Sequence, residues 1–319
     1  MNRLSAFLVF WVVVLAACNP ITPSVATSTT EIDAGSVQPP ATPKPSPPTE
    51  EPTEPPIETP FSLQPAAGQR VEFEAEDGVQ LVGYFYPAVI SNAPVVVLMH
   101  WAGGDQTDWT EIGMVQWLQN RLAENPIPPE QVGIFPPVPV GLSFAVFTFD
   151  FRDFGESQPF PGVSFMQIAS GWLLDAKAAY KTAKEMLGVD PVRVAGFGSS
   201  IGADAVVDAC IDATCLGTFS LSPGGYLQIP YENAVTDLSD EVWLTIPKAE
   251  SLTAPIYCVA SEMDIPSSRV CESVTTDPYR HIIFPGEVHG SLLLVAPTNP
   301  PEIGQVILDW LLYTFSLSE

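Results

Sequence analysis

Six short, continuous runs of apolar residues constrain the fold of this chain more than any other feature. Runs of this length are typical of strands that are buried on both faces of a sheet. Helical patterns at 168–187 and 202–210 separate some of the runs, and a third at 302–315 follows the last. Strands and helices in alternation predict an α/β domain with a mostly parallel sheet covered by helices on both faces. The runs cover 94–99, 144–149, 192–195, 216–221, 256–260 and 281–284.

A different pattern precedes these runs. Residues 70–75 and 79–85 alternate between apolar and polar side chains on either side of an Asp-Gly pair at 77–78. Alternation at period two around such a turn predicts an N-terminal β-hairpin. We therefore expect one folded domain over 68–319, a length that suits a single α/β domain.

A candidate nucleophile lies between a predicted strand and a predicted helix. Residues 198–202 are Gly-Ser-Ser-Ile-Gly, a G-x-S-x-G motif in the context that it requires. The nucleophile sits in a tight turn, so the residues two before and two after it must be small. Ser200 has Gly198 and Gly202 at these positions, whereas Ser199 has larger neighbours there and is excluded.

A hydrolytic serine needs a histidine to accept its proton and a carboxylate to orient that histidine. His289 lies after the last strand, on a loop before the terminal helix, and is the predicted base. Asp264 and Glu262 both follow the run at 256–260, and Asp264 is preferred as the acid. The order Ser200, Asp264, His289 is the one that this topology imposes. The alternative for either acid is a solvated charge on a loop.

With these motifs, residues 68–319 resemble the α/β-hydrolase superfamily, and in particular its small esterase, dienelactone-hydrolase-like and lysophospholipase-like members. Residues 100–104, His-Trp-Ala-Gly-Gly, resemble the loop after the third strand that supplies an oxyanion donor. Residues 150–157 resemble the D-x-R-G-x-G-x-S segment after the fourth strand. The resemblance implies an α/β-hydrolase fold and an oxyanion hole formed by the backbone N–H groups of Trp101 and Ile201.

The chain departs from the family pattern at two positions where glycine is usual, and its predicted nucleophile is a serine where one group of the family has cysteine. Trp101 and Asp153 stand where glycine is usual, and Trp101 is expected to narrow the site. Dienelactone hydrolases proper use a cysteine nucleophile, so Ser200 puts that substrate in doubt, but not the fold. The segment 223–254 has room for a small lid, so we expect little or no cap domain.

The N-terminus predicts export. Arg3 precedes an apolar run over 6–17 that is too short to span a membrane but suits a signal peptide. Leu-Ala-Ala-Cys, ending at Cys18, resembles the lipobox of bacterial lipoproteins. This resemblance implies a signal peptide over 1–17 and a lipid on Cys18, which would anchor the protein on the extracytoplasmic side of the bacterial cell envelope. An ordinary cleaved signal or a short uncleaved anchor is the alternative.

Between the anchor and the domain, residues 18–67 are dominated by Pro, Thr, Ser and Glu. So little apolar surface cannot repay the entropy of ordering, and this segment is expected to be a disordered, extended stalk. The whole chain has 12 Lys and Arg against 37 Asp and Glu, a net charge of −25. That balance argues against nucleic acid as a partner and against a basic lipid-binding patch.

Four cysteines remain after Cys18, an even number that suits an oxidising compartment. We favour two local disulfides, between Cys210 and Cys215 and between Cys258 and Cys271, with other pairings and free thiols left open. Their spacing does not support a metal site, and no metal is expected. Of the other histidines, His100 is assigned to the oxyanion loop and His281 to a strand edge without a chemical role.

These features together predict a membrane-anchored serine hydrolase that cleaves small carboxylic esters through an acyl-enzyme intermediate. We expect a monomer that needs no cofactor. Two alternatives remain open: a catalytically silent binding protein of the same fold, and a peptidase or thioesterase of the same fold.

Overall fold

The structure, a computed structural model, describes residues 67–124, 126–159, 165–225, 254–273 and 280–317. The predicted signal peptide, Cys18 and nearly all of the predicted stalk lie outside these ranges. Most of the predicted lid lies outside them as well. Within the described ranges, no helix is both long enough and apolar enough to cross a bilayer.

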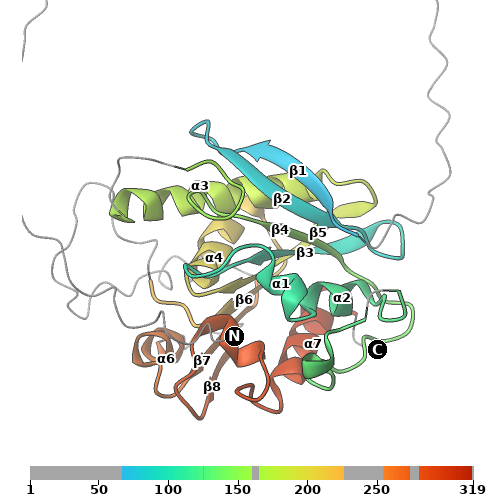
Figure 1. The fold of residues 1–319 in the computed structure, drawn as a ribbon, viewed down its shortest axis with the longest axis vertical. Coiled ribbons are helices and arrows are strands. Elements are labelled where there is room, and N and C mark those ends of the chain that lie inside the picture. Colours follow the sequence, from blue (N-terminus) through green and yellow to red (C-terminus); the bar gives the residue numbers. More distant parts are fainter. Residues whose placement is uncertain (1–66, 125, 160–164, 226–253, 274–279, 318–319) are drawn as a thin grey trace, which may run out of the picture. The chain divides into compact units, whose positions relative to one another are not determined.

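In the part of the chain that the structure describes, eight strands form one sheet, and helices precede, follow or connect them (Figure 1). The strands are β1 Gln69–Glu74, β2 Gln80–Tyr86, β3 Ala93–Met99, β4 Ala145–Phe149, β5 Val189–Ser199, β6 Thr218–Leu221, β7 Ile256–Ser261 and β8 Arg280–Phe284. The helices are α1 Asp108–Glu111, α2 Met114–Gln119, α3 Phe165–Lys184, α4 Ile201–Ala213, α6 Ile265–Glu272 and α7 Ile303–Thr314, with 3-10 turns η1 Pro129–Gln131 and η3 Gly290–Leu294.

The strand order is β1-β2-β4-β3-β5-β6-β7-β8. In Figure 1 the colours run from the blue β1 at one edge to the red β8 at the other. The hairpin β1–β2 is antiparallel, β2 is antiparallel to β4, and every later neighbour is parallel. The predicted hairpin and the mostly parallel sheet are therefore confirmed. Parallel pairing brings the carboxyl ends of β3, β5, β6 and β7 to one edge of the sheet.

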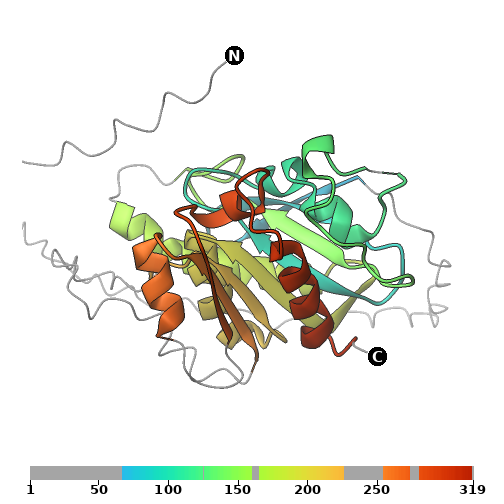
Figure 2. The same ribbon diagram turned by 90° about the horizontal axis from the view of Figure 1, so that it is seen from below.

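Helices cover both faces of the sheet, as predicted (Figure 2). The alternation of side chains along β3 shows the two layers, because successive residues of a strand point to opposite faces. Val96 and Leu98 pack in a core with side chains of α1, α2 and α7. Val95 and Val97 pack in a second core with side chains of α3 and α4. All of these strand residues are fully buried, which explains why the sequence runs are continuously apolar.

Two features differ from the sequence prediction. Helices α1, α2 and α6 were not expected, because helices of four, six and eight residues are too short for a helical period to stand out. Strand β5 was expected over 192–195 but continues to Ser199. It continues because residues 196–199 pair with β6 while 196–198 also pair with β3.

A buried cation joins the hairpin to the rest of the domain. Arg152, on the loop after β4, is almost completely buried. It forms ion pairs with Asp175 of α3 at 2.7 Å and with Asp77 of the hairpin turn at 2.6 Å. A buried charge is tolerated only when it is paired and hydrogen-bonded, and Arg152 meets this condition with two carboxylates. The arginine of the 150–157 segment therefore fixes tertiary structure.

Candidate active site

Ser200 occupies a strained turn between β5 and α4. Its φ of 56° and ψ of −114° lie outside the usual regions for a residue with a side chain. A conformation of this kind costs on the order of 1–3 kcal/mol and persists only where the surroundings enforce it. Here the Ser200 N–H donates to the Leu221 carbonyl of β6, and the Ser200 carbonyl accepts from Ala203 in α4. The turn projects the serine at the carboxyl edge of the sheet.

The two glycines of the motif are required by close backbone contacts. A Cβ at Gly198 would collide with the Gly202 carbonyl, and a Cβ at Gly202 would collide with the Met99 carbonyl of β3. The first turn of α4 therefore rests directly on the ends of β5 and β3. These contacts support the steric argument made from the sequence for small residues on both sides of Ser200.

The structure brings the three predicted side chains together. His289 lies on the loop between β8 and η3, and its Nε2 is 2.9 Å from Ser200 Oγ. Its Nδ1 is 2.7 Å from Asp264 Oδ2. A carboxylate beside Nδ1 keeps the proton on that nitrogen, which leaves Nε2 free to accept the serine proton. The imidazole is one-third exposed whereas the Asp264 side chain is 10% exposed, so a substrate can reach the base but not the acid.

Asp264 is held in its ionised form. It directly precedes α6 but does not cap that helix with its side chain, which faces His289 instead. Burial acts to raise the pKa of Asp264, but the hydrogen bond and charge interaction with His289, with smaller contributions from Ser267 and Ser222, outweigh it and lower the pKa. Glu262, the rejected alternative, is exposed. The preference for Asp264 over Glu262 thus agrees with the geometry.

The two predicted oxyanion donors lie on adjacent segments. Ile201 is the first residue of α4, and its N–H precedes the point where helical hydrogen bonds begin. Trp101 follows β3 by two residues, and Gly202 packs against the backbone of Met99 and His100. The start of α4 and the start of the Trp101 loop are therefore in contact. Their role as oxyanion donors remains a prediction.

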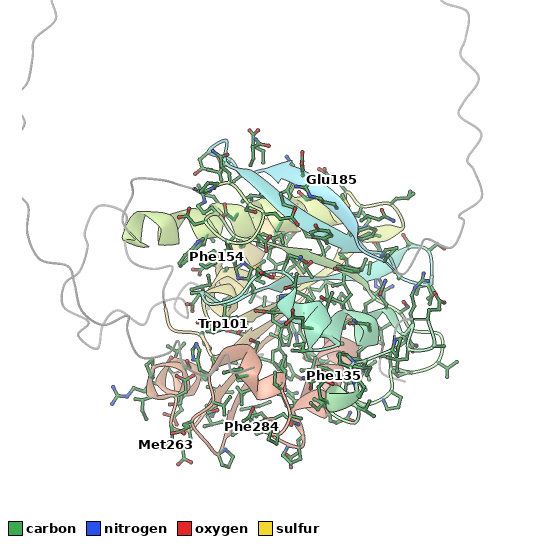
Figure 3. The ribbon with its side chains drawn as sticks, in the orientation of Figure 1. Trp101, Phe135, Phe154, Glu185, Met263 and Phe284 are labelled. Atoms are coloured by element: carbon green, nitrogen blue, oxygen red, sulfur yellow. A yellow bond between two sulfur atoms is a disulfide. The ribbon has the colours of Figure 1, made fainter. Side chains whose placement is uncertain are left out.

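The Trp101 side chain folds back over its own loop (Figure 3). Its ring lies where a Cβ on Gly103 would sit, and its Nε1–H donates to Asp108 Oδ2 at 2.9 Å. Burial raises the pKa of Asp108 to about 6, against the hydrogen bond from Trp101 and together with repulsion from Asp105 and Glu111. The hydrogen bond between the indole and this carboxylate links the two ends of the loop. The Trp101 side chain therefore holds the loop in shape, a role that its replacement of glycine did not suggest.

His100 is buried beside the same loop. Its Nε2 accepts the Phe151 N–H at 3.1 Å, so Nδ1 carries the proton and donates to the Trp101 carbonyl at 2.7 Å. Burial lowers the pKa of His100 to about 4, which keeps the ring neutral. Asp150 adds a further tie, because its carboxylate accepts the N–H groups of Gln106 and Glu156. His100 thus supports the oxyanion loop, in agreement with its assignment from the sequence.

Both predicted cysteine pairs are at disulfide distance. Cys210 and Cys215 have Cα atoms 5.1 Å apart, and Cys258 and Cys271 have Cα atoms 5.2 Å apart. The second pair joins β7 to α6, on either side of Asp264. It therefore braces the segment that holds the acid against the sheet.

Three further observations concern other residues that the sequence brings near the site. His281 lies in β8, the edge strand, as expected. Trp109 and Trp172, which lie near the strand ends in the sequence, are fully buried in the core. Within the described ranges, no group of three or more His, Cys, Asp or Glu side chains is arranged to hold a metal ion.

The sequence reasoning missed two sets of residues near the site. One is Asp108, the partner of the Trp101 indole. The other is a set of serines at the ends of β5, β6 and β7, of which Ser222 accepts the N–H of Gly290 on the His289 loop. Two of these serines had a signal in the sequence, because Ser222 and Ser261 directly follow the apolar runs at 216–221 and 256–260.

Comparison with known proteins shows sequence relatives of undetermined role. No protein-family model matches the chain. The uncharacterised protein Rv2307c of Mycobacterium tuberculosis is 26% identical over 256 residues, which cover 76% of this chain and 77% of that protein. The uncharacterised protein YfhR of Escherichia coli K12 is 28% identical over 146 residues, covering 45% of this chain and 42% of YfhR.

Solved structures share the architecture. The α/β hydrolase GrgF from Penicillium sp. sh18 matches with a TM-score of 0.54 and 16% identity, over 78% of this chain and 99% of that one. The esterase Pf2001 of Pyrococcus furiosus matches with a TM-score of 0.52 and 17% identity, over 78% and 91%. An acetyl xylan esterase from Paenibacillus sp. R4 gives 0.51 and 15%, over 76% and 82%. Similarity at these identities concerns the fold, which is the α/β-hydrolase fold.

The raised pKa of Asp108 makes stability depend on pH. Its folded pKa of about 6 exceeds the ordinary 3.8, so ionisation of Asp108 destabilises the fold as pH rises through 6. Asp108→Asn keeps an acceptor for Trp101 but cannot ionise. We therefore expect the difference in free energy of unfolding, variant minus wild type, to be about 1 kcal/mol larger at pH 7 than at pH 4. This value is smaller than the pKa shift alone implies, because Asp108 is partly exposed and solvent screens its charge. Urea denaturation at both pH values measures this, and a difference that stays constant with pH would contradict it.

The disulfide beside Asp264 gives a second prediction. Cys258→Ala with Cys271→Ala opens a loop with a sequence separation of 13, and should lower the free energy of unfolding by about 3 kcal/mol in the chain-entropy model. Cys210→Ala with Cys215→Ala, at a separation of 5, is the matched control and should lose about 2 kcal/mol. Non-reducing peptide mapping of exported protein tests the pairing directly. Four free thiols or a Cys210–Cys258 crosslink would reject it.

Proposed function

We propose that this chain is a serine hydrolase that cleaves carboxylic esters through a covalent acyl-enzyme. The hydrogen-bonded series Ser200, His289, Asp264 carries the proposal, with separations of 2.9 and 2.7 Å. A nucleophile, a base in contact with it and an acid that orients the base are the components that acyl transfer requires. Their place at the carboxyl edge of a mostly parallel sheet, after β5, β7 and β8, supports the same reading.

In the first half of the reaction, Ser200 Oγ attacks the ester carbonyl carbon while its proton passes to His289 Nε2. The carbonyl electrons move onto oxygen, where the N–H groups of Ile201 and Trp101 would stabilise the charge. Donors of this kind contribute about 3–4 kcal/mol each when they are fixed in advance. The tetrahedral intermediate then expels the alcohol, which takes the proton from His289, and the acyl group remains on Ser200.

In the second half, water attacks the acyl-enzyme. His289 Nε2 removes a proton from the water, the oxyanion forms again, and Ser200 leaves with that proton as the carboxylic acid departs. Asp264 stays ionised throughout and stabilises the imidazolium that forms twice. The lowered pKa of Asp264 is consistent with this role.

Two observations bear on the substrate. Exposed apolar side chains lie close in sequence to the acid and the base: Met263 and Ile265 flank Asp264, and Leu292 follows His289 by three residues. Met263, at 62% exposure, points outward in Figure 3. A net charge of −25 disfavours anionic substrates. Both features favour an uncharged ester with apolar groups, and two solved proteins of similar fold are named as esterases.

Replacement of the nucleophile tests the reaction. Ser200→Ala should lower kcat/KM for a short-chain aryl ester by roughly 10⁴-fold or more, because the variant lacks the hydroxyl that forms the acyl-enzyme. A fluorophosphonate probe should label wild type at Ser200, as peptide mass spectrometry can show, and should not label the variant. A label on another serine, or substantial activity in the variant, would refute the assignment. Thioester and aminoacyl-amide substrates in the same assay would separate a thioesterase or peptidase from an esterase.

The anchoring is a further part of the proposal. We propose that a lipid on Cys18 holds the domain at the bacterial membrane through the 18–67 stalk, on the extracytoplasmic side. The lipobox and the apolar run before it support this. Several acyl chains on one cysteine anchor stably where one chain does not.

Cys18→Ser should abolish lipid attachment and shift the protein from the membrane fraction to the soluble or unprocessed fraction. Mass spectrometry of the mature N-terminus decides the matter in wild type. A mature chain that begins with an unmodified residue other than Cys18 would rule out the lipoprotein.

A further inference from the structure

Three buried serine hydroxyls lie at the carboxyl ends of three neighbouring strands. Ser199 is the last residue of β5, Ser222 directly follows β6, and Ser261 is the last residue of β7. All three residues are fully buried. Because β5, β6 and β7 are adjacent and parallel, the hydroxyls share one edge of the sheet. These three serines are distinct from the proposed nucleophile, base and acid.

Each hydroxyl binds the backbone of the loop that carries His289. Ser261 Oγ donates to the carbonyl of Val288 at 2.6 Å. Ser222 Oγ accepts the N–H of Gly290 at 2.9 Å, and Ser199 Oγ accepts the N–H of Ser291 at 2.8 Å. The loop thus crosses the ends of β7, β6 and β5 in turn. Its backbone is held immediately before His289 and at the two residues after it.

The residues at these contacts are closely constrained. Gly290 has a φ of 62°, and a Cβ on it would lie 2.6 Å from Ser199 Oγ, so only glycine fits this crossing. Ser222 itself has a φ of 55°, a left-handed conformation that is costly for serine. Its N–H donates to the Val259 carbonyl of β7 at 2.7 Å, which helps to hold that conformation.

Ser222 also acts on the acid. Burial acts to raise the pKa of Asp264, and His289 lowers it, with smaller contributions from Ser267 and Ser222. The Ser222 hydroxyl therefore favours the ionised acid and also holds the backbone next to the base.

We propose that Ser199, Ser222 and Ser261 are positioning residues that hold His289 with Nε2 facing Ser200 while the ring gains and loses its proton. The inference rests on the proposed hydrolase function. A base on an unsupported loop would drift, and a displacement of about 1 Å at a reacting group can cost 100-fold in rate. The hydroxyls act through the His289 backbone and do not touch the substrate.

Ser222→Ala tests the proposal against a matched control. The variant should lose roughly 10- to 100-fold in kcat while KM for an aryl ester changes less than about twofold, because a misplaced base affects the transition state. Ser143→Ala is the control. Ser143 is equally buried and its hydroxyl also binds backbone, accepting the Val89 N–H and donating to the Gln119 carbonyl, but it lies before the amino end of β4, away from the carboxyl ends of the strands. Its kcat should stay within twofold of wild type.

A second pair of variants separates the hydroxyl from the shape of the side chain. Ser261→Thr and Ser261→Val are nearly identical in volume, and β7 accepts a β-branched residue. Only threonine keeps the donor to the Val288 carbonyl. The threonine variant should retain roughly tenfold more kcat than the valine variant, a difference that a purely structural role in packing would not produce.

The readout must also separate this inference from the proposed function. If wild type neither hydrolyses the ester panel nor reacts with a fluorophosphonate, the proposed function fails, and NMR of the His289 ring then decides the positioning role. The downfield Nδ1 proton resonance of the bond to Asp264 should persist in wild type and Ser143→Ala and be lost in Ser222→Ala. The proposal is overturned if Ser222→Ala keeps this resonance, or if it loses no more kcat than Ser143→Ala.

Discussion

The close packing of the first turn of α4 against the carboxyl ends of β3 and β5 sets the geometry on which the rest of the site depends. With no side chain at Gly198 or Gly202, backbone meets backbone at this junction. Ser200 is thereby held in a strained conformation, and the loop after β3 begins next to the helix N-terminus. A side chain at Gly198 would push α4 away from β5, and one at Gly202 would push it away from the segment that leads to Trp101, a predicted oxyanion donor. The position of the nucleophile therefore follows from sterics before any hydrogen bond to His289 forms.

Around this junction, polar groups hold the loops in place. Asp150 and His100 both join the loop after β3 to the loop after β4, and Arg152 links the hairpin turn to α3. Each of these groups is buried, where an unpaired polar atom is costly, so each loop has one well-defined arrangement. Apolar contacts alone are less directional and would leave such loops several positions. The chemistry at the sheet edge thus depends on buried polar contacts that do not themselves react.

Much of this could be predicted from the sequence, because it depends on local patterns. The apolar runs indicate a mostly parallel sheet, Ser200 follows from the size of its neighbours, and His289 and Asp264 follow from their places after strands. The bond between Trp101 and Asp108 and the crossing of Gly290 over Ser199 could not be predicted. They depend on how segments distant in sequence approach one another, and no local period records that. The signal peptide, the lipid on Cys18 and the stalk remain predictions, because they lie outside the described residues.

The position of Trp101 makes its fluorescence a reporter of the candidate site. Among the tryptophans that the structure describes, those at 109, 117, 172 and 310 are fully buried, whereas Trp101 is partly accessible. Of these five tryptophans, Trp101 is therefore the one that a collisional quencher in solution reaches first. Because this indole lies on the loop beside Ser200, the proposed nucleophile, an ester analogue that bound there and covered the loop would shield it. Occupancy of the site can then be followed by intrinsic fluorescence, without a chromogenic substrate and in a variant that cannot turn over.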